Sequence, residues 1–137
     1  MKRIAVALGL GSVLALCAVA LASTALSGTY STTIGKSAGG LAGAWTMTFA
    51  SPKYTITDKG STVVTGTYTL SGNKITFTDK GGKDACPGKG VYQYTESGRS
   101  LTFKRISDTN AKCAGRRAVL ASTFTKKFSS SGSGGSY

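Results

Sequence analysis

The chain has 137 residues and a formal net charge of +12, from 17 Lys and Arg against 5 Asp and Glu. This length fits one domain and not comfortably two. No histidine is present, which excludes Ser-His-Asp and Cys-His catalysis and the usual zinc sites. With no catalytic or metal-binding motif in the chain, we expect a protein that is not an enzyme and that holds no cofactor and no metal.

The N-terminal segment has the pattern of an export signal. Lys2 and Arg3 precede an uncharged run over residues 4–26 that is rich in Ala, Leu and Val. An Ala-Leu-Ala sequence ending at Ala22 then supplies the small residues that a signal peptidase requires. We therefore predict a signal peptide over residues 1–22 and a secreted or periplasmic protein.

Three alternatives remain for this segment. Cleavage after Ala25 is the second choice of site. The apolar run also exceeds the roughly 20 residues that span a bilayer, so an uncleaved signal segment would anchor the protein in the membrane. Lipidation of Cys17 would anchor it as well, although Leu16 is larger than the residue that usually precedes a lipidated cysteine.

Composition divides the rest of the chain into three parts. Residues 23–40 are small and polar, which predicts a flexible lead-in. Residues 129–137 are a Ser/Gly segment of low complexity, which predicts a disordered tail. The folded domain is therefore expected over residues 41–128.

Within that domain, apolar and polar residues alternate with a period of two, and many of them are β-branched or aromatic. The predicted strands are residues 43–49, 53–57, 63–70, 74–78, 91–95, 100–106 and 118–124. No extended helical period follows residue 41, and we expect no helix to cover the sheet. The fold class is thus all-β, an antiparallel meander closing into a small barrel, with a β-sandwich as the alternative.

Turn residues separate the strands. The tripeptide Asp-Lys-Gly occurs at residues 58–60 and again at 79–81. An aspartate opens a turn by bonding its own backbone, and glycine accepts a positive φ. Ser-Gly pairs at residues 71–72 and 97–98 mark two further hairpins, and successive hairpins predict a meander.

The chain contains three cysteines. Cys17 lies within the predicted signal peptide, which leaves Cys86 and Cys113 as an even pair. In an oxidising compartment such a pair is normally bridged. On the chain-entropy model this bridge would stabilise the fold by about 3.5 kcal/mol.

The sequence Gly43-Ala44-Trp45 on the first predicted strand, followed by a meander and a late arginine, resembles the lipocalin-like (calycin) pattern. The stretch from Asp108 to Cys113-Ala-Gly-Arg116 also looks like a group of small exported lipocalin-like proteins of unassigned function. The resemblance implies that Trp45 packs near the closed end of the barrel, with Arg116 or Arg117 lying across it as a structural cap. Asp108 is expected to pair with one of these arginines or to bond nearby backbone.

Aromatic residues crowd the predicted inner face. Five of them are candidates for the barrel interior or for a ligand-lining role: Tyr68, Phe77, Tyr92, Tyr94 and Phe103. Eight strands can enclose an interior that side chains fill or one that holds a small ligand. So many aromatic rings favour the filled interior.

Two functions from different classes fit these features. The first is a secreted non-enzymatic lipocalin-like binding protein, with a small apolar ligand in the barrel or a partner at its rim. The alternative is a secreted basic protein-interaction or inhibitor module that acts on anionic envelope components. Nucleic acid is not an expected partner, because the aromatic residues share the inward face and the outward face is Thr and Lys.

Overall fold

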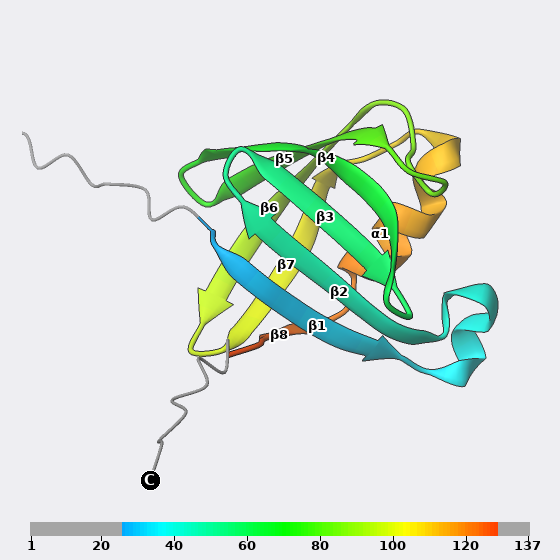
Figure 1. The fold of residues 1–137 in the computed structure, drawn as a ribbon. Coiled ribbons are helices and arrows are strands. Elements are labelled where there is room, and N and C mark those ends of the chain that lie inside the picture. Colours follow the sequence, from blue (N-terminus) through cyan, green and yellow to red (C-terminus); the bar gives the residue numbers. More distant parts are fainter. Residues whose placement is uncertain (1–25, 129–137) are drawn as a thin grey trace, which may run out of the picture.

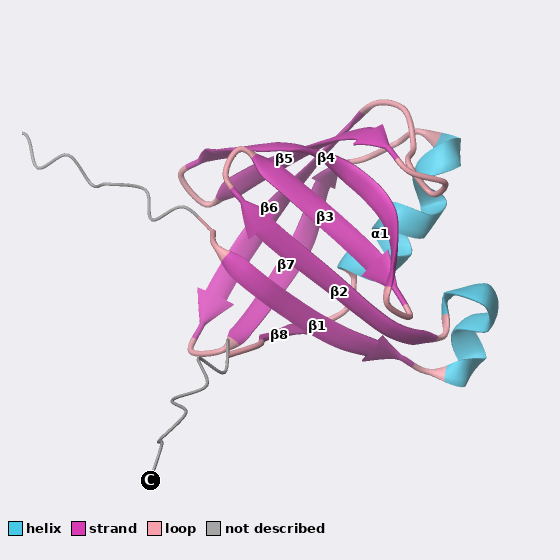
Figure 2. Ribbon diagram, viewed as in Figure 1, coloured by secondary structure: helices cyan, strands magenta, loops and turns pink. Residues whose placement is uncertain are grey.

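A computed structural model describes residues 26–128 of the chain (Figures 1 and 2). The signal peptide predicted over residues 1–22, the two cleavage sites, Cys17 and the tail predicted over residues 129–137 lie outside the described residues.

Eight antiparallel strands form a closed barrel in which each strand pairs with its neighbours in chain order and β1 pairs with β8. The strands are β1 Gly28–Ile34, β2 Gly43–Ala50, β3 Lys53–Asp58, β4 Ser61–Ser71, β5 Lys74–Gly81, β6 Lys89–Ser97, β7 Ser100–Ser107 and β8 Phe124–Lys126. The predicted all-β meander that closes into a barrel is confirmed. Closure also pairs both edges of the sheet, which a sandwich would leave open.

The barrel core follows from the period-two pattern. Alternate residues of each strand point inward, and their aromatic rings meet edge to face; Phe77, for example, contacts Tyr54 and Tyr92 with centroid distances of 5.1 and 6.0 Å. Phe49 joins Tyr68 in the same way at 5.1 Å. Edge-to-face pairs stabilise beyond their buried area, and they fill the interior of the barrel.

The flexible lead-in predicted over residues 23–40 is wrong for its described part. Residues 28–34 form β1, which pairs with β2 and β8, and residues 36–41 form the 3-10 helix η1 (Lys36–Leu41). The strand β1 shows no period-two pattern of apolar residues, because its composition is small and polar and Tyr30 is its one fully buried residue. Trp45 consequently lies on the second strand of the barrel and not on the first.

The strand predicted over residues 118–124 is also wrong, and so is the expected absence of a covering helix. The 3-10 helix η2 (Ala111–Cys113) leads into the helix α1 (Ala114–Leu120), and a strand resumes only at Phe124. Alanine, arginine and leucine favour a helix here. Val119 and Leu120 both lie on α1, and both side chains are buried although they are adjacent in sequence.

The two ends of the barrel differ in their connections (Figure 1). At one end, here called the helix end, lie η1, the β3–β4 turn, the β5–β6 loop over residues 82–88, and the η2–α1 segment. At the opposite end, here called the hairpin end, each connection has two residues: 51–52, 72–73 and 98–99. The long connections therefore all gather at the helix end.

Cys86 and Cys113 form the predicted disulfide, which ties the β5–β6 loop to η2 at the helix end. The bridge therefore links two segments that are not strand neighbours.

Among residues 26–128, no helix combines the length and the hydropathy that crossing a bilayer requires.

Candidate functional site

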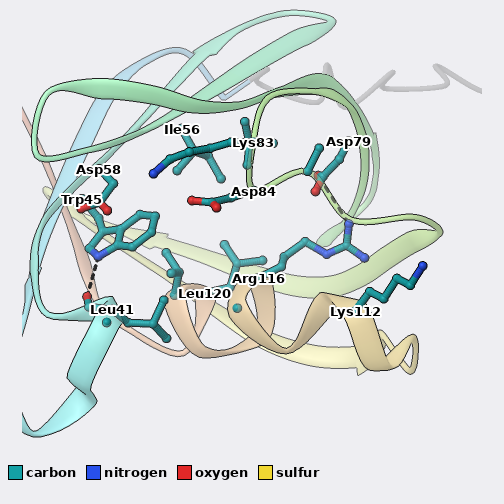
Figure 3. A pocket seen from close by; sticks show the side chains of 15 residues that line it. Leu41, Trp45, Ile56, Asp58, Asp79, Lys83, Asp84, Lys112, Arg116 and Leu120 are labelled. Atoms are coloured by element: carbon teal, nitrogen blue, oxygen red, sulfur yellow. Dashed lines mark hydrogen bonds and ion pairs between the residues drawn. The ribbon is translucent and has the colours of Figure 1, made fainter.

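A pocket of about 440 Å³ opens at the helix end of the barrel (Figure 3). Its apolar lining comes from strand ends and from α1: Trp45, Ile56, Val64, Val119 and Leu120. Its charged lining comes from strand ends, from the β5–β6 loop and from η2 and α1: Asp58, Asp79, Lys83, Asp84, Lys112 and Arg116. The volume lies in the range of small-molecule sites.

Trp45 is fixed at one side of this pocket. The indole Nε1–H donates to the carbonyl of Leu41 at 2.7 Å, which joins β2 to η1. A tryptophan N–H that is buried needs such an acceptor. With this bond made, the ring is held in place and its apolar surface contributes to the pocket.

The β5–β6 loop covers the opposite side. Gly82 has a φ of +104°, and a Cβ there would collide with the backbone of Val63. The backbone N–H of Asp84 donates to the carbonyl of Val63 at 3.0 Å. Only glycine permits this close approach, which holds Lys83 and Asp84 over the pocket.

An ion network closes the barrel beside the pocket. The Arg116 guanidinium, whose side chain is 6 % exposed, binds Asp108 with both Nε···Oδ2 and Nη2···Oδ1 at 2.8 Å. Its Nη1 lies 3.4 Å from Asp79 Oδ1. Such a two-pronged pair is among the strongest interactions between side chains, and one arginine here balances two buried carboxylates.

Neutral donors add further hydrogen bonds to both carboxylates. Tyr92 donates its hydroxyl to Asp108 Oδ2, Tyr54 donates to Asp79 Oδ1, and the backbone N–H of Cys86 donates to Asp79 Oδ2 at 2.9 Å. The bond from Cys86 connects the network to the disulfide. The helix end is thus held by charge, by hydrogen bonds and by a covalent bridge.

These contacts shift the ionisation of the groups involved. Burial alone would raise the pKa of Asp108, but hydrogen bonds from Arg116 and Tyr92 outweigh it and hold that pKa below its ordinary value. Burial, and then the bonds to Asp79 and Asp108, raise the pKa of Tyr54 and of Tyr92 above the ordinary range for tyrosine. At neutral pH Asp108 is therefore ionised, and the phenols of Tyr54 and Tyr92 are neutral.

Gly90 on β6 makes room for the network. A Cβ at this position would lie 2.9 Å from Asp108 Oδ2 and 3.0 Å from Arg116 Nε. Both distances are shorter than ordinary van der Waals contact. The absence of a side chain on β6 is what allows Asp108 and Arg116 to meet against the strand.

The structure distributes the predicted cap residues over two sets of contacts. Arg116 pairs with Asp108, as one of the two expected arginines, and Arg117 donates to the backbone carbonyls of Asp108 at 3.2 Å and Asn110 at 2.7 Å. Trp45 bonds to Leu41 and lines the pocket together with Arg116. Arg116 therefore binds the carboxylates at the helix end, and among residues 26–128 its polar partners are Asp79, Asp108 and the carbonyl of Gly88 rather than Trp45.

The five aromatic candidates for a ligand-lining role belong to the interior and not to the pocket lining. Tyr68, Phe77 and Tyr92 are buried, Tyr94 and Phe103 are partly buried, and Phe103 packs on Phe77 at 5.7 Å. None of the five lines the pocket at the helix end. The prediction of a filled barrel interior agrees with this packing.

Sequence reasoning missed most of the residues that form the pocket. Asp58 and Asp79 were interpreted as turn openers, whereas they are strand residues of β3 and β5 at inward positions, since they follow Ile56 and Phe77 by two residues. Extending the period-two pattern by one step would have found both. Lys83 and Asp84 carried no such signal, because their position depends on a loop.

Residues 26–128 contain no cluster of three or more Cys, Asp or Glu side chains arranged to hold a metal ion. The site is an apolar pocket with a charged rim at one end of a closed eight-stranded antiparallel barrel. Searches with the sequence and the structure found no matching protein-family model, no matching curated protein and no matching solved structure.

Proposed function

We propose that this protein is an exported, non-enzymatic, lipocalin-like binding protein that holds a small ligand in the pocket at the helix end. The main support for this proposal is a pocket of about 440 Å³ with an apolar floor and a charged rim. It lies beside a barrel interior that aromatic side chains fill. A small molecule with an apolar body and a polar group fits such a lining.

The supporting features come from the rigidity of the site. The floor belongs to strand ends of a closed barrel, Trp45 is fixed by its bond to Leu41, and the β5–β6 loop is fixed by the disulfide. A preorganised site binds more tightly because little conformational freedom is lost on binding.

The test is native mass spectrometry of the exported full chain, compared with two variants of α1. Gly115 lines the pocket, and a Cβ there would meet nothing within 4 Å. Gly115→Phe should therefore fill the pocket without disturbing the fold, whereas Ala114→Phe, on the exposed surface of the same helix, is the matched control.

We expect the wild-type chain and the Ala114→Phe variant to carry a copurified small molecule that Gly115→Phe lacks. A wild-type chain without any bound molecule would contradict the proposal. Retention of the molecule by Gly115→Phe would place binding elsewhere and contradict it too.

A second function, a basic module for anionic envelope polymers, is favoured by one surface. Strands β5–β7 present four exposed lysines on the outside of the barrel: Lys74, Lys80, Lys89 and Lys104. Lys74 and Lys104 lie on either side of Gln93 in strand register. The acids of these strands are engaged elsewhere, Asp79 by Arg116 and Glu96 by Lys126.

Retention on a dextran sulfate column tests this second function. Charge reversal in Lys74→Glu with Lys104→Glu should lower the salt concentration needed for elution more than Lys36→Glu with Lys53→Glu, which leaves those strands unchanged. Equal effects of the two double variants would show that retention depends on the net charge of the protein and not on this surface, which would contradict the second function.

A further inference from the structure

We propose that the ligand of this pocket is a small organic cation, in which an ammonium or guanidinium group donates to Asp58 and an apolar body packs on the pocket floor. The inference rests on the proposed function, since it names the ligand class of the same site. It comes from a comparison of two aspartates that share a sequence context and differ in their partners.

Asp58 and Asp79 each begin the tripeptide Asp-Lys-Gly. Each lies on a strand that runs toward the helix end, two residues after an inward apolar residue, and both line the pocket. Asp79 receives donors from Arg116, Tyr54 and Cys86. Its carboxylate is therefore fully satisfied within the protein.

Asp58 has no equivalent set of donors. Its Oδ1 is the one buried side-chain oxygen or nitrogen in residues 26–128 that lacks a hydrogen-bond partner. No ion pair to Asp58 occurs among the described residues. A buried acceptor without a donor is costly, and a donor supplied by a ligand would remove that cost.

The surroundings of Asp58 suit a cation with an apolar body. Asp58 pairs in register with Trp45, so the two side chains are neighbours on the inner face, and Figure 3 shows them side by side at one edge of the pocket. Ile56 and Leu120 continue the apolar lining from there. A cation beside a tryptophan ring gains an additional electrostatic attraction.

Most of the acidic residues of the chain lie at this end of the barrel. The whole chain has 5 acidic residues, and four of them lie at the helix end: Asp58, Asp79 and Asp84 line the pocket, and Asp108 binds the pocket residue Arg116. Arg116 is committed to two carboxylates. The same rim also holds Lys83 and Lys112, so the attraction for a cation comes from the unsatisfied carboxylate of Asp58 and not from an excess of negative charge at this end.

Inorganic cations fit less well than an organic one. Hard metal ions bind six or more oxygen ligands or keep several waters, whereas no cluster of three acidic or sulfur ligands exists in residues 26–128. The pocket instead pairs one unsatisfied carboxylate with an apolar floor. That combination matches a cationic group attached to hydrocarbon.

Three probes with the same apolar body separate charge from shape: 2-phenylethylammonium, 2-phenylethanol and 3-phenylpropionate. Trp45 is the one tryptophan of the chain, so its fluorescence reports directly on this pocket. We expect the ammonium to bind about tenfold or more tightly than the alcohol. The carboxylate should bind more weakly than either.

Asp58→Asn keeps the shape of the side chain and removes its charge, and it should weaken ammonium binding about tenfold or more. The matched control Asp84→Asn, at an exposed position of the same rim, should cost less than about fivefold. Without ligand, Asp58→Asn should be at least as stable as the wild type in urea, while Asp79→Asn should be less stable. Reduced stability of Asp58→Asn would indicate an internal partner and overturn the inference.

The remaining outcomes distinguish this inference from the proposed function. Tighter binding of the carboxylate or the alcohol than of the ammonium would overturn the organic cation and leave the pocket as a ligand site. Ammonium binding that Asp58→Asn does not weaken would also overturn it. No response of Trp45 to any of the three probes would count against the pocket itself.

Discussion

The helix end and the hairpin end close the same barrel with different interactions. At the hairpin end, the buried side chain of Leu26 belongs to the hydrophobic core, and the Tyr68 hydroxyl donates to the Leu26 carbonyl at 2.8 Å. Tyr30 donates to Glu96 at 2.9 Å, and the ion pair of Glu96 with Lys126 is long, at 4.0 Å, and partly exposed. This end is closed mainly by apolar packing.

The helix end uses two buried carboxylates, one arginine, two tyrosines and a disulfide. The two ends differ in the length of their connections. A two-residue hairpin is too short to line a pocket, whereas η1, the β5–β6 loop and α1 contribute side chains to the pocket lining. Irregular segments without a continuous hydrogen-bond ladder need other restraints. The ion network and the disulfide provide these restraints and leave room for a ligand.

The largest expected difference between the ends is in their ion pairs. Arg116→Met leaves Asp79 and Asp108 buried without a cation, which should lower the free energy of unfolding by about 3–5 kcal/mol. Lys126→Met at the hairpin end removes an exposed pair and should cost less than about 1 kcal/mol. Urea denaturation measures both.

A matched double variant checks the cause. Asp108→Asn combined with Arg116→Met removes one of the two stranded charges and should recover part of the loss. Equal losses for Arg116→Met and Lys126→Met would show that the two ends are not held differently.

Removal of the disulfide tests the covalent restraint of the helix end. Cys86→Ala with Cys113→Ala should lower the free energy of unfolding by about 3.5 kcal/mol, because the unfolded chain regains the freedom of the closed loop. Reductant should destabilise the wild type by a similar amount and leave the double variant unchanged. A double variant as stable as the oxidised wild type would contradict the stabilising role of the bridge.

Leu26→Ala tests the apolar closure of the hairpin end. The side chain is 1 % exposed, and a buried leucine truncated to alanine costs about 2–5 kcal/mol, with the smaller values where the site can relax. We expect about 2 kcal/mol here by urea denaturation, since Leu26 precedes the first strand. No measurable loss would mean that the hairpin end is closed by its tyrosines alone.

The smallest effect for a single side chain appears at alkaline pH. Unfolded tyrosines lose their protons at about pH 10, whereas burial and the bonds to acidic partners raise the pKa of Tyr54 and Tyr92 at the helix end and of Tyr30 at the hairpin end. Stability is therefore unaffected below pH 10 and decreases above it, by about 1.4 kcal/mol per pH unit for each tyrosine that remains protonated.

Phenylalanine variants assign this loss to each end. Tyr54→Phe with Tyr92→Phe should reduce the alkaline slope about twice as much as Tyr30→Phe, as measured by urea denaturation from pH 9 to pH 11. Parallel pH profiles for the wild type and all variants would show that these tyrosines titrate normally in the folded protein.

The sequence by itself determined the period-two strands, the antiparallel meander and the pairing of Cys86 with Cys113, because alternation, turn residues and an even cysteine count are local or compositional signals. It also indicated that Asp108 would pair with Arg116 or Arg117. It did not identify β1, whose small residues become a strand only by pairing with β2 and β8. Nor did it identify α1, which gains its stability by burying Val119 and Leu120.

The tertiary structure alone decided where the pocket lies and which acids remain unsatisfied. Asp58 and Asp79 have the same local sequence, and only the long-range placement of Arg116, Tyr54 and Cys86 gives one of them its donors. Hydrogen-bond satisfaction of a buried group depends on residues that are distant in sequence, so local patterns do not encode it. For that reason the filled interior was predictable from the aromatic residues, whereas the candidate site required the assembled barrel.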